Sequence, residues 1–412
     1  MDGLNSGDTA WMLASAAMVL FMTPGLAAFY SGMVRRKNVL STTMQSFFAM
    51  GSVTIIWMLF GYSLAFSNGT GVLAPFIGGF TYLGLNGISD QLAPLAPTIP
   101  LTVYAMYQGM FAIITVGLIT GAVAERMKFK AYVIFTVLWA IFVYSPLAHW
   151  VWQPEGWLFK LGALDFAGGT VVHISSAAAA LAAALMLGKR KGLGTDAIHP
   201  HNLPLTVLGA GILWFGWFGF NAGSALAANG LAGSAFLNTH VAAAAALIMW
   251  VIAETFHAGK PTVLGAASGA VAGLVAVTPA AGYIEPWAAV IIGATAGVLC
   301  YFALGLKTKF GFDDALDVVG IHGVGGTTGA ILTGVFATVA INSAGRNGLL
   351  YGAPKQVAIQ LVGVFAAWVF SFGVSVVILK LTDALVGLRV DEETESRGLD
   401  IGEHSEEGYI LD

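Results

Sequence analysis

Long apolar runs dominate this sequence and limit what it can fold into. A helix needs about 20 apolar residues to cross the ~30 Å hydrocarbon core of a bilayer. Only 10% of the residues are charged, against roughly a quarter in a soluble domain, so the chain has too little charge to cover a water-facing surface. The sequence therefore predicts an all-α integral membrane protein and excludes a soluble enzyme, a disordered chain and a coiled coil. We expect eleven transmembrane helices, at about residues 10–33, 43–66, 100–123, 131–149, 168–187, 204–226, 237–257, 262–280, 286–306, 318–340 and 356–381.

The Lys and Arg residues are distributed unevenly between the loops, which orients these helices. If eleven helices cross the membrane in turn, fifteen Lys and Arg residues fall on one face and only Lys160, Arg346 and Lys355 fall on the other. Cytoplasmic loops carry the excess of positive charge. We therefore expect a multi-pass protein of the plasma (inner) membrane, with its N-terminus outside and its C-terminus in the cytoplasm.

Two related Asp and His pairs indicate an inverted repeat. Asp165 precedes His173 near the start of the fifth run, and Asp317 precedes His322 near the start of the tenth. Membrane transporters are often built from repeats of opposite orientation. We expect five helices within about 10–190, five within 204–340 and an eleventh appended, all in one membrane domain over 1–385. Residues 386–412 are polar and are expected to form a cytoplasmic tail.

His173 and His322 are ionisable residues inside apolar runs, which makes them functional candidates. The alternative is that each is a buried residue that bonds a neighbouring helix, but their related positions favour a function. At a rise of ~1.5 Å per residue, the two histidines lie deep enough to meet near the midplane. A neutral imidazole has one N–H donor and one acceptor, which suits a small polar solute or a proton. It suits K⁺ or Na⁺ poorly, since carbonyl rings and carboxylates bind those ions better.

For two further residues, Asp165 and Trp152, the sequence allows two alternative roles. Asp165 either caps the following helix or attracts a cation. Trp152 belongs either to the aromatic belt at the membrane surface or to a cation–π site. A single cysteine, Cys300, excludes a Cys-based metal site. The sequence contains no metal cluster, nucleophile elbow or cofactor loop, so we expect no metal, no cofactor and no enzyme. The modest net charge of −4 does not indicate a nucleic-acid partner.

Residues 165–190, DFAGGTVVHISSAAAALAAALMLGKR, closely resemble the signature of the ammonium transporter family (Amt/Mep, with the Rhesus proteins as relatives). The resemblance continues through residues 30–38, 108–126, 214–225, 276–284 and 317–334, and reaches the tail at 398–409. It therefore covers essentially the whole chain.

This resemblance implies a role for each matching residue of the pore. His173 and His322 match the paired pore histidines of the family. Phe111 and Phe220 match the stacked phenyl gate above them. The resemblance thus implies a pore that conducts ammonia past two imidazoles beneath an aromatic gate.

The resemblance also implies an outer site that recruits ammonium. Trp152 and Ser224 match that site, with Phe111 as its floor, and Asp165 matches an aspartate beside it. The pore-side positions of the family match Trp217 and Thr278. Rhesus proteins usually lack the outer Trp, so the chain resembles the bacterial-type Amt/Mep branch. The segment from Trp152 to Asp165 is one residue longer than in the bacterial forms, so that loop is expected to differ.

The family implies partners as well. Its members form homotrimers in the lipid bilayer with one pore per protomer, and bacterial members bind a PII (GlnK-type) regulatory protein at the cytoplasmic face. We expect ammonium or ammonia as the substrate, methylammonium as its analogue, and uptake across the plasma membrane. The transported species is either NH₃ alone or NH₃ with a separate proton. An alternative function is that of an ammonium sensor that regulates a partner such as PII.

Overall fold

The computed structural model describes residues 3–89 and 91–410, and most of these residues are helical. The first part of the chain contains α1 Ser6–Met33, α2 Val39–Ile56, α3 Tyr62–Phe66, α4 Leu101–Val123, α5 Phe129–Trp139, α6 Ser145–Trp152, α7 Trp157–Leu161 and α8 Ser175–Leu187. The second part contains α9 Leu203–Ala222, α10 Gly230–Ala258, α11 Val263–Val277, α12 Pro286–Ala303, α13 Gly305–Phe310, α14 Val324–Phe336, α15 Lys355–Val386, α16 Glu392–Arg397 and α17 Leu399–His404.

Several of these helices are joined end to end by short turns of other helix types. The π-helical turns are η2 Trp57–Gly61, η5 Ala140–Tyr144, η6 Gly169–Ile174 and η8 Val319–Gly323. The 3₁₀ turns are η1 Arg36–Asn38, η3 Gly71–Leu73, η4 Leu83–Leu85, η7 Gly223–Ala225 and η9 Leu349–Tyr351. Single π-helical turns inside longer helices occur frequently at functional sites. Two of the four, η6 and η8, contain His173 and His322.

Ten helical segments among the described residues are long and apolar enough to cross a membrane. The prediction of a helical, multi-pass membrane protein is therefore confirmed. The number eleven is not, because the run expected at 262–280 contains only α11, an apolar helix of 15 residues. At ~1.5 Å per residue α11 is about 22 Å long, which is shorter than the hydrocarbon core.

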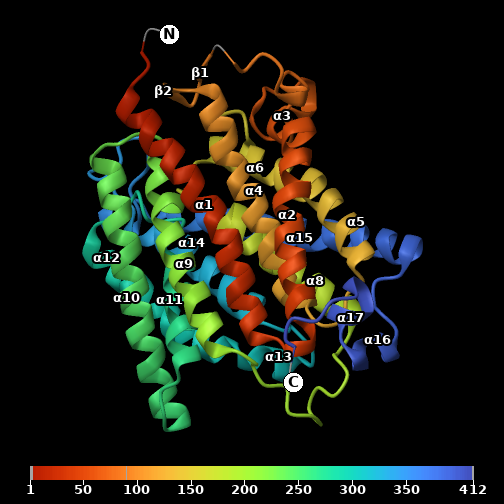
Figure 1. Ribbon diagram of the computed structural model, residues 1–412. Coiled ribbons are helices and arrows are strands. Elements are labelled where there is room, and N and C mark those ends of the chain that lie inside the picture. The colour runs from red at the N-terminus through yellow and green to blue at the C-terminus, as the bar shows by residue number, and fades with distance from the viewer. Residues whose placement is uncertain (1–2, 90, 411–412) are drawn as a thin grey trace.

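The long loop before α4 departs from the expected all-α fold. Residues Leu92–Ala93 (β1) and Ala96–Pro100 (β2) form a small antiparallel pair. Pro94 lies in the turn, and Pro97 and Pro100 lie in β2; proline is tolerated there because both strands of a two-stranded pair are edge strands. The pair lies at the end of the helix bundle that also carries the N-terminus (Figure 1).

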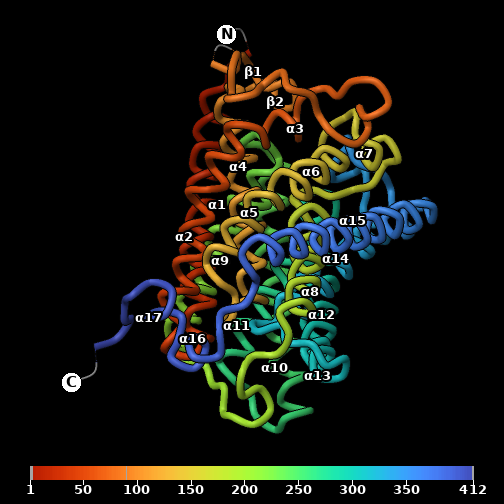
Figure 2. The backbone as a smooth tube through the Cα atoms, turned by 90° about the vertical axis from the view of Figure 1, so that its right-hand side faces the viewer, coloured from red at the N-terminus to blue at the C-terminus, as the bar shows by residue number. Residues whose placement is uncertain are grey.

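The two termini lie at opposite ends of the helix bundle (Figures 1 and 2). We call the end near residue 3 the N-terminal face and the end that carries the tail the C-terminal face. Helices α1 and α9 pack side by side, and a side chain at Gly209 would collide with the backbone nitrogen of Phe29. This close approach explains why small residues are useful in a membrane bundle. Helix α15 runs obliquely across the bundle and contacts α8 and α14.

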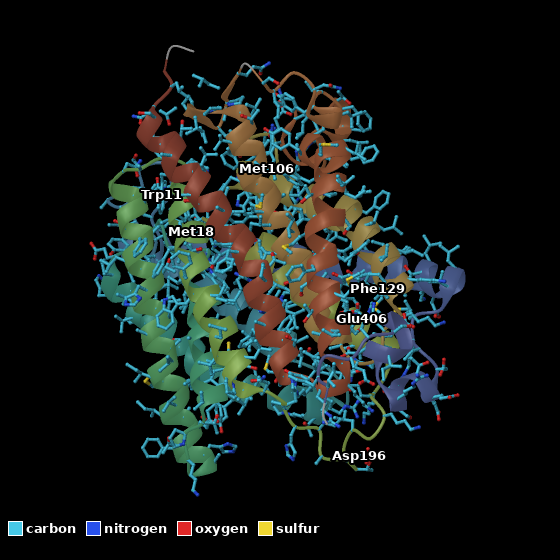
Figure 3. The ribbon with its side chains drawn as sticks, in the orientation of Figure 1. Trp11, Met18, Met106, Phe129, Asp196 and Glu406 are labelled. Atoms are coloured by element: carbon cyan, nitrogen blue, oxygen red, sulfur yellow. The ribbon has the colours of Figure 1, made fainter. Side chains whose placement is uncertain are left out.

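The tail contacts the ends of two membrane helices at the C-terminal face. Asp400 Oδ1 accepts a hydrogen bond from the backbone N–H of Ser41 at 2.8 Å, and Glu403 Oε2 accepts one from Phe129 N–H at 2.8 Å. These carboxylates cap the N-termini of α2 and α5, which have no cap residue of their own. Figure 3 shows Phe129 and Glu406 of the tail on the same side of the molecule. The tail is therefore a docked part of the fold, which its polar composition did not predict.

Candidate functional site

Asp165 caps the helix that contains His173. Its two carboxylate oxygens accept hydrogen bonds from the backbone N–H groups of Gly168, Gly169, Thr170 and Val171, at 2.6–3.2 Å, and from the Thr170 hydroxyl. Burial raises the pKa of the Asp165 carboxyl, although the hydrogen bonds from Thr170 and the glycines oppose this shift. Of the two interpretations, the structure shows the cap. The carboxylate is saturated by these donors, so it does not point a free oxygen at a cation.

The second histidine helix begins in the same way, but with a different aspartate than the sequence suggested. Asp314 Oδ2 accepts a hydrogen bond from Val319 N–H at 2.7 Å, whereas Asp317 has a φ of 64° and forms an ion pair with Lys307 at 2.6 Å. The pairing of Asp165 with Asp317 is therefore wrong, and Asp314 is the counterpart of Asp165.

This correction makes the two histidine helices match position by position. Asp165 precedes His173 by the same spacing as Asp314 precedes His322. Three residues after each aspartate, the backbone turns through a positive φ, 117° at Gly168 and 64° at Asp317. Burial and the charge of Asp317 raise the pKa of Asp314 to about 6. The two histidine helices therefore begin with the same local structure.

The two histidines are in direct contact inside the bundle. His173 Nδ1 and His322 Nδ1 are 3.2 Å apart, and the two rings are stacked with centroids 5.2 Å apart. A hydrogen bond between two Nδ1 atoms needs one donor and one acceptor, so in the neutral pair one ring carries its proton on Nδ1 and the other on Nε2. The pair therefore offers one N–H and one lone pair on its Nε2 atoms. His173 Nε2 is buried and has no hydrogen-bond partner among the described residues.

Two phenyl rings in close contact, tilted by 30° to one another, separate the histidines from the N-terminal face. Phe111 on α4 and Phe220 on α9 are buried, with ring centroids 4.2 Å apart. The ring of Phe220 is also stacked with that of His173, at 6.1 Å. Trp152, at the end of α6, stands perpendicular to Phe111 at 5.9 Å. The indole, the two phenyl rings and the imidazole thus form a continuous series of aromatic contacts.

Ser224 lies beside the phenyl pair and is held by a residue that sequence reasoning missed. The Ser224 hydroxyl donates to the Phe220 carbonyl at 2.8 Å, so its oxygen lone pairs remain able to accept a hydrogen bond. Tyr107 OH lies 3.2 Å from Ser224 Oγ, and its single proton is shared between the carbonyls of Gly219 at 3.0 Å and Phe220 at 2.9 Å. Tyr107 stands one helical turn before Phe111 on the same face of α4, and this spacing is the signal that could have identified it.

An open cavity of about 430 Å³ leads to the phenyl pair from the N-terminal face. Trp152, Phe111, Ser224 and Asp165 all line it, as does Arg346. The four residues that the resemblance assigned to an outer site are therefore brought together around one cavity.

A second, enclosed cavity of about 10 Å³ lies on the other side of the phenyl pair. Phe220, Trp217 and both histidines line it, and the rest of its wall is apolar. A space of this size is close to the minimum that holds one water-sized molecule. Trp217 is stacked on His173 at 5.4 Å and donates its indole N–H to Thr278 Oγ1 at 2.9 Å. Thr278 therefore bonds the indole and fixes the ring that is stacked on His173.

Buried ion pairs hold the C-terminal face beneath the histidines. Arg190 binds Asp313 through two hydrogen bonds of 2.9 Å and approaches Glu125 at 3.4 Å, and Arg35 pairs with Glu125 at 2.8 Å. Burial disfavours the Asp313 carboxylate, but Arg190 outweighs this effect and lowers its pKa. Within residues 3–89 and 91–410, no group of three His, Cys, Asp or Glu side chains is arranged to hold a metal ion.

Comparison with known proteins identifies the relatives of this chain. The model of the Ammonium Transporter Family matches residues 10–409. An ammonium transporter of Bacillus subtilis (strain 168) is 52% identical, over 98% of this chain and 99% of its own length. An ammonium transporter of Aquifex aeolicus (strain VF5) is 51% identical, over 99% of this chain and 94% of its own.

Solved structures share the fold. The crystal structure of Saccharomyces cerevisiae Mep2 has a TM-score of 0.89 and 38% identity, and the match covers 95% of this chain and 89% of that one. A structure described as a sensor Amt protein has a TM-score of 0.87 and 30% identity, over 97% of this chain and 98% of that one.

Proposed function

Since this chain belongs to the ammonium transporter family, we propose that it takes up ammonium by binding NH₄⁺ in the Trp152 cavity and conducting NH₃ past the paired histidines. The observation that carries this proposal is the order in which the elements contact one another. The open cavity comes first, the phenyl pair second and the histidine pair third, and each contacts the next through an aromatic ring.

Recruitment uses the aromatic rings and one hydroxyl. An amine with a pKa like that of lysine is almost wholly protonated at neutral pH, so ammonium arrives as a cation. The faces of Trp152 and Phe111 attract a cation by ~0.5–2 kcal/mol, and Ser224 Oγ accepts one N–H. These contacts replace part of the water shell. Asp165 supports the site by its carbonyl, which accepts the indole N–H of Trp152 at 2.9 Å.

The cation gives one proton to water in the open cavity before it passes the phenyl pair as neutral ammonia. Moving a charged group into an apolar interior costs several kcal/mol or more, and the cavity beyond Phe220 is nearly all apolar. Neutral ammonia is the size of a water molecule and has donors and an acceptor for the two imidazoles. The released proton either returns to the outside or crosses by the hydrogen bond between His173 and His322, which gives net transport of NH₃ or of NH₃ with H⁺.

Selectivity follows from the same step. K⁺ cannot donate a hydrogen bond to Ser224 and cannot lose a proton, so it does not enter the apolar passage. The methylammonium ion has both properties but is larger, and it serves as a slower analogue.

The topology proposed with this function has the N-terminal face outside and the C-terminal face in the cytoplasm. The excess of Lys and Arg expected on the C-terminal face supports this orientation. The matching aspartates, positive φ residues and histidines support two inverted halves, 10–190 and 204–340, within a membrane domain of eleven helices over 1–385. In this topology α11 crosses together with the turns that follow it to residue 284, and residues 386–412 are the cytoplasmic tail.

The partners proposed with this function follow from membership of the family. We propose a homotrimer in which each protomer has its own pore, and a PII-type regulatory protein that binds the C-terminal face. The docked tail supports regulation at this face, because its carboxylates cap two membrane helices there.

Currents on a supported membrane test the proposal. The reconstituted protein should give a transient current after a pulse of ammonium, a smaller one after methylammonium and none after K⁺. Because passage of NH₃ alone carries no charge, vesicles with an internal pH dye should accompany the current measurement. Ammonium pulses that change neither the current nor the internal pH would refute the proposal.

A sensor function is the second candidate, and the likeness to a structure described as a sensor Amt protein favours it. A sensor would pass the ammonium signal to a partner through the C-terminal face. A variant that has lost the response of its partner but keeps full ammonium flux would favour sensing. Loss of both together would favour transport as the primary function.

A further inference from the structure

We propose that Gln360 of α15 is a positioning residue for the outer site, because its amide clamps the backbone segment that holds Trp152. This inference rests on the proposed function only for its effect on transport. The clamp itself is a property of the fold.

The amide of Gln360 is buried and uses its full hydrogen-bonding capacity. Its Oε1 accepts from the backbone N–H of Leu164 at 2.7 Å, and its Nε2 donates to the Leu164 carbonyl at 2.7 Å. The second N–H of the amide donates to the Ala330 carbonyl at 3.0 Å, and Gln356 Nε2 donates to Gln360 Oε1 at 3.3 Å. A buried amide in a membrane helix is costly compared with an apolar side chain unless it is satisfied in this way.

The clamped residue directly precedes the segment that builds the outer site. Leu164 is followed by Asp165, whose carbonyl accepts the indole N–H of Trp152 and whose carboxylate caps the His173 helix. Gln356 secures the same segment two residues earlier, by donating to the Gly162 carbonyl at 2.9 Å. If the Leu164 backbone is released, the carbonyl that orients Trp152 is no longer fixed.

The hydrogen bond from Gln360 Nε2 to the Ala330 carbonyl connects Gln360 to the helix that follows His322. Ala330 lies in α14, which continues directly from the π-helical turn that contains His322. One amide therefore joins the outer cavity, through Leu164, to the helix that follows the pore histidine. Figure 2 shows α15 running obliquely across the bundle, where it packs against α14.

The test compares two matched substitutions of buried glutamines by a side chain of similar shape. Gln360→Met removes the clamp, and Gln45→Met removes a buried amide on α2 whose Oε1 has no hydrogen-bond partner in the described part of the chain. We expect Gln360→Met to weaken the apparent affinity for ammonium about three- to tenfold, within the range of a cation–π contact. The maximal current should change less than about twofold. Gln45→Met should leave the affinity unchanged.

A double substitution separates positioning from general damage to the fold. If Gln360 acts through Trp152, Gln360→Met should cause no further loss of affinity in a Trp152→Leu background, because the effects of coupled residues do not add. Equal loss in both backgrounds, or an affinity equal to that of Gln45→Met, would overturn the proposal.

Hydrogen exchange gives a readout that is independent of transport. The Leu164 amide should exchange faster in Gln360→Met than in the wild type, and unchanged exchange would overturn the clamp. If the wild-type protein itself moves no ammonium, the proposed function fails, while the exchange of Leu164 still decides whether the clamp exists.

Discussion

Asn at position 165 should destabilise the helix that contains His173. Asp165 Oδ1 accepts two backbone N–H groups, and Oδ2 accepts two more together with the Thr170 hydroxyl. The amide of Asn keeps one acceptor oxygen, and its NH₂ group must then face the remaining N–H donors. At least two hydrogen bonds to a charged acceptor are lost, at ~1.5–3 kcal/mol each. The free energy of unfolding should therefore fall by about 3–6 kcal/mol.

The matched control is Asp196→Asn, the same substitution at an exposed position in the loop between α8 and α9 (Figure 3). Unfolding of the purified proteins in micelles measures the two free energies, and ammonium currents measure the effect on the pore. Asp196→Asn should resemble the wild type in both assays. If Asp165→Asn unfolds with the same free energy as Asp196→Asn, the cap is not the structural element described above.

Three further substitutions test separate parts of the account. Trp152→Leu should weaken the apparent affinity for ammonium about 2- to 30-fold with little change in maximal rate, and an unchanged affinity in flux assays would remove Trp152 from the site. Thr278→Val leaves the buried indole N–H of Trp217 without its acceptor. The maximal current should therefore be reduced by a larger factor than the apparent affinity for ammonium. Equal factors for the two quantities would contradict this role. The raised pKa of Asp314 means that the folded protein binds the proton more tightly than the unfolded chain, so the stability from this group is complete below about pH 4 and is lost as the pH rises through about 6. Unfolding of Asp314→Asn between pH 4 and 7 should lack this decline, and parallel curves for variant and wild type would refute it.

The helices were predictable from the sequence because lipid requires every backbone group to bond within its own segment. The runs expected at 100–123 and 168–187 coincide with Leu101–Val123 and Gly169–Leu187 to within one residue. The second span begins earlier than the expected residue 43, at Arg36, and its first residues bond the tail through Asn38 and Ser41. The hydropathy of this segment alone cannot locate the start of the second helix, since the contacts that fix it come from the distant tail.

The sequence allowed us to predict which candidate residues lie together, but not which residues support them. The spacing between Asp and His was visible in the sequence at Asp165, and the same spacing would have selected Asp314 over Asp317. The positive φ at Asp317 gave no signal, because a non-glycine residue does not reveal this conformation. The contacts of Gln360 with Leu164 and of the tail with Phe129 join distant parts of the chain, and no periodicity in one segment predicts them.

Parallel recordings of ammonium and K⁺ currents from the wild type and from His322→Ala test the central claim most directly. The account predicts that the wild type responds to ammonium alone. The variant, which lacks one of the two imidazoles, should either lose the ammonium current or allow K⁺ to compete with it. A His322→Ala protein with the wild-type ammonium rate and unchanged exclusion of K⁺ would show that the paired histidines are not the path of the solute.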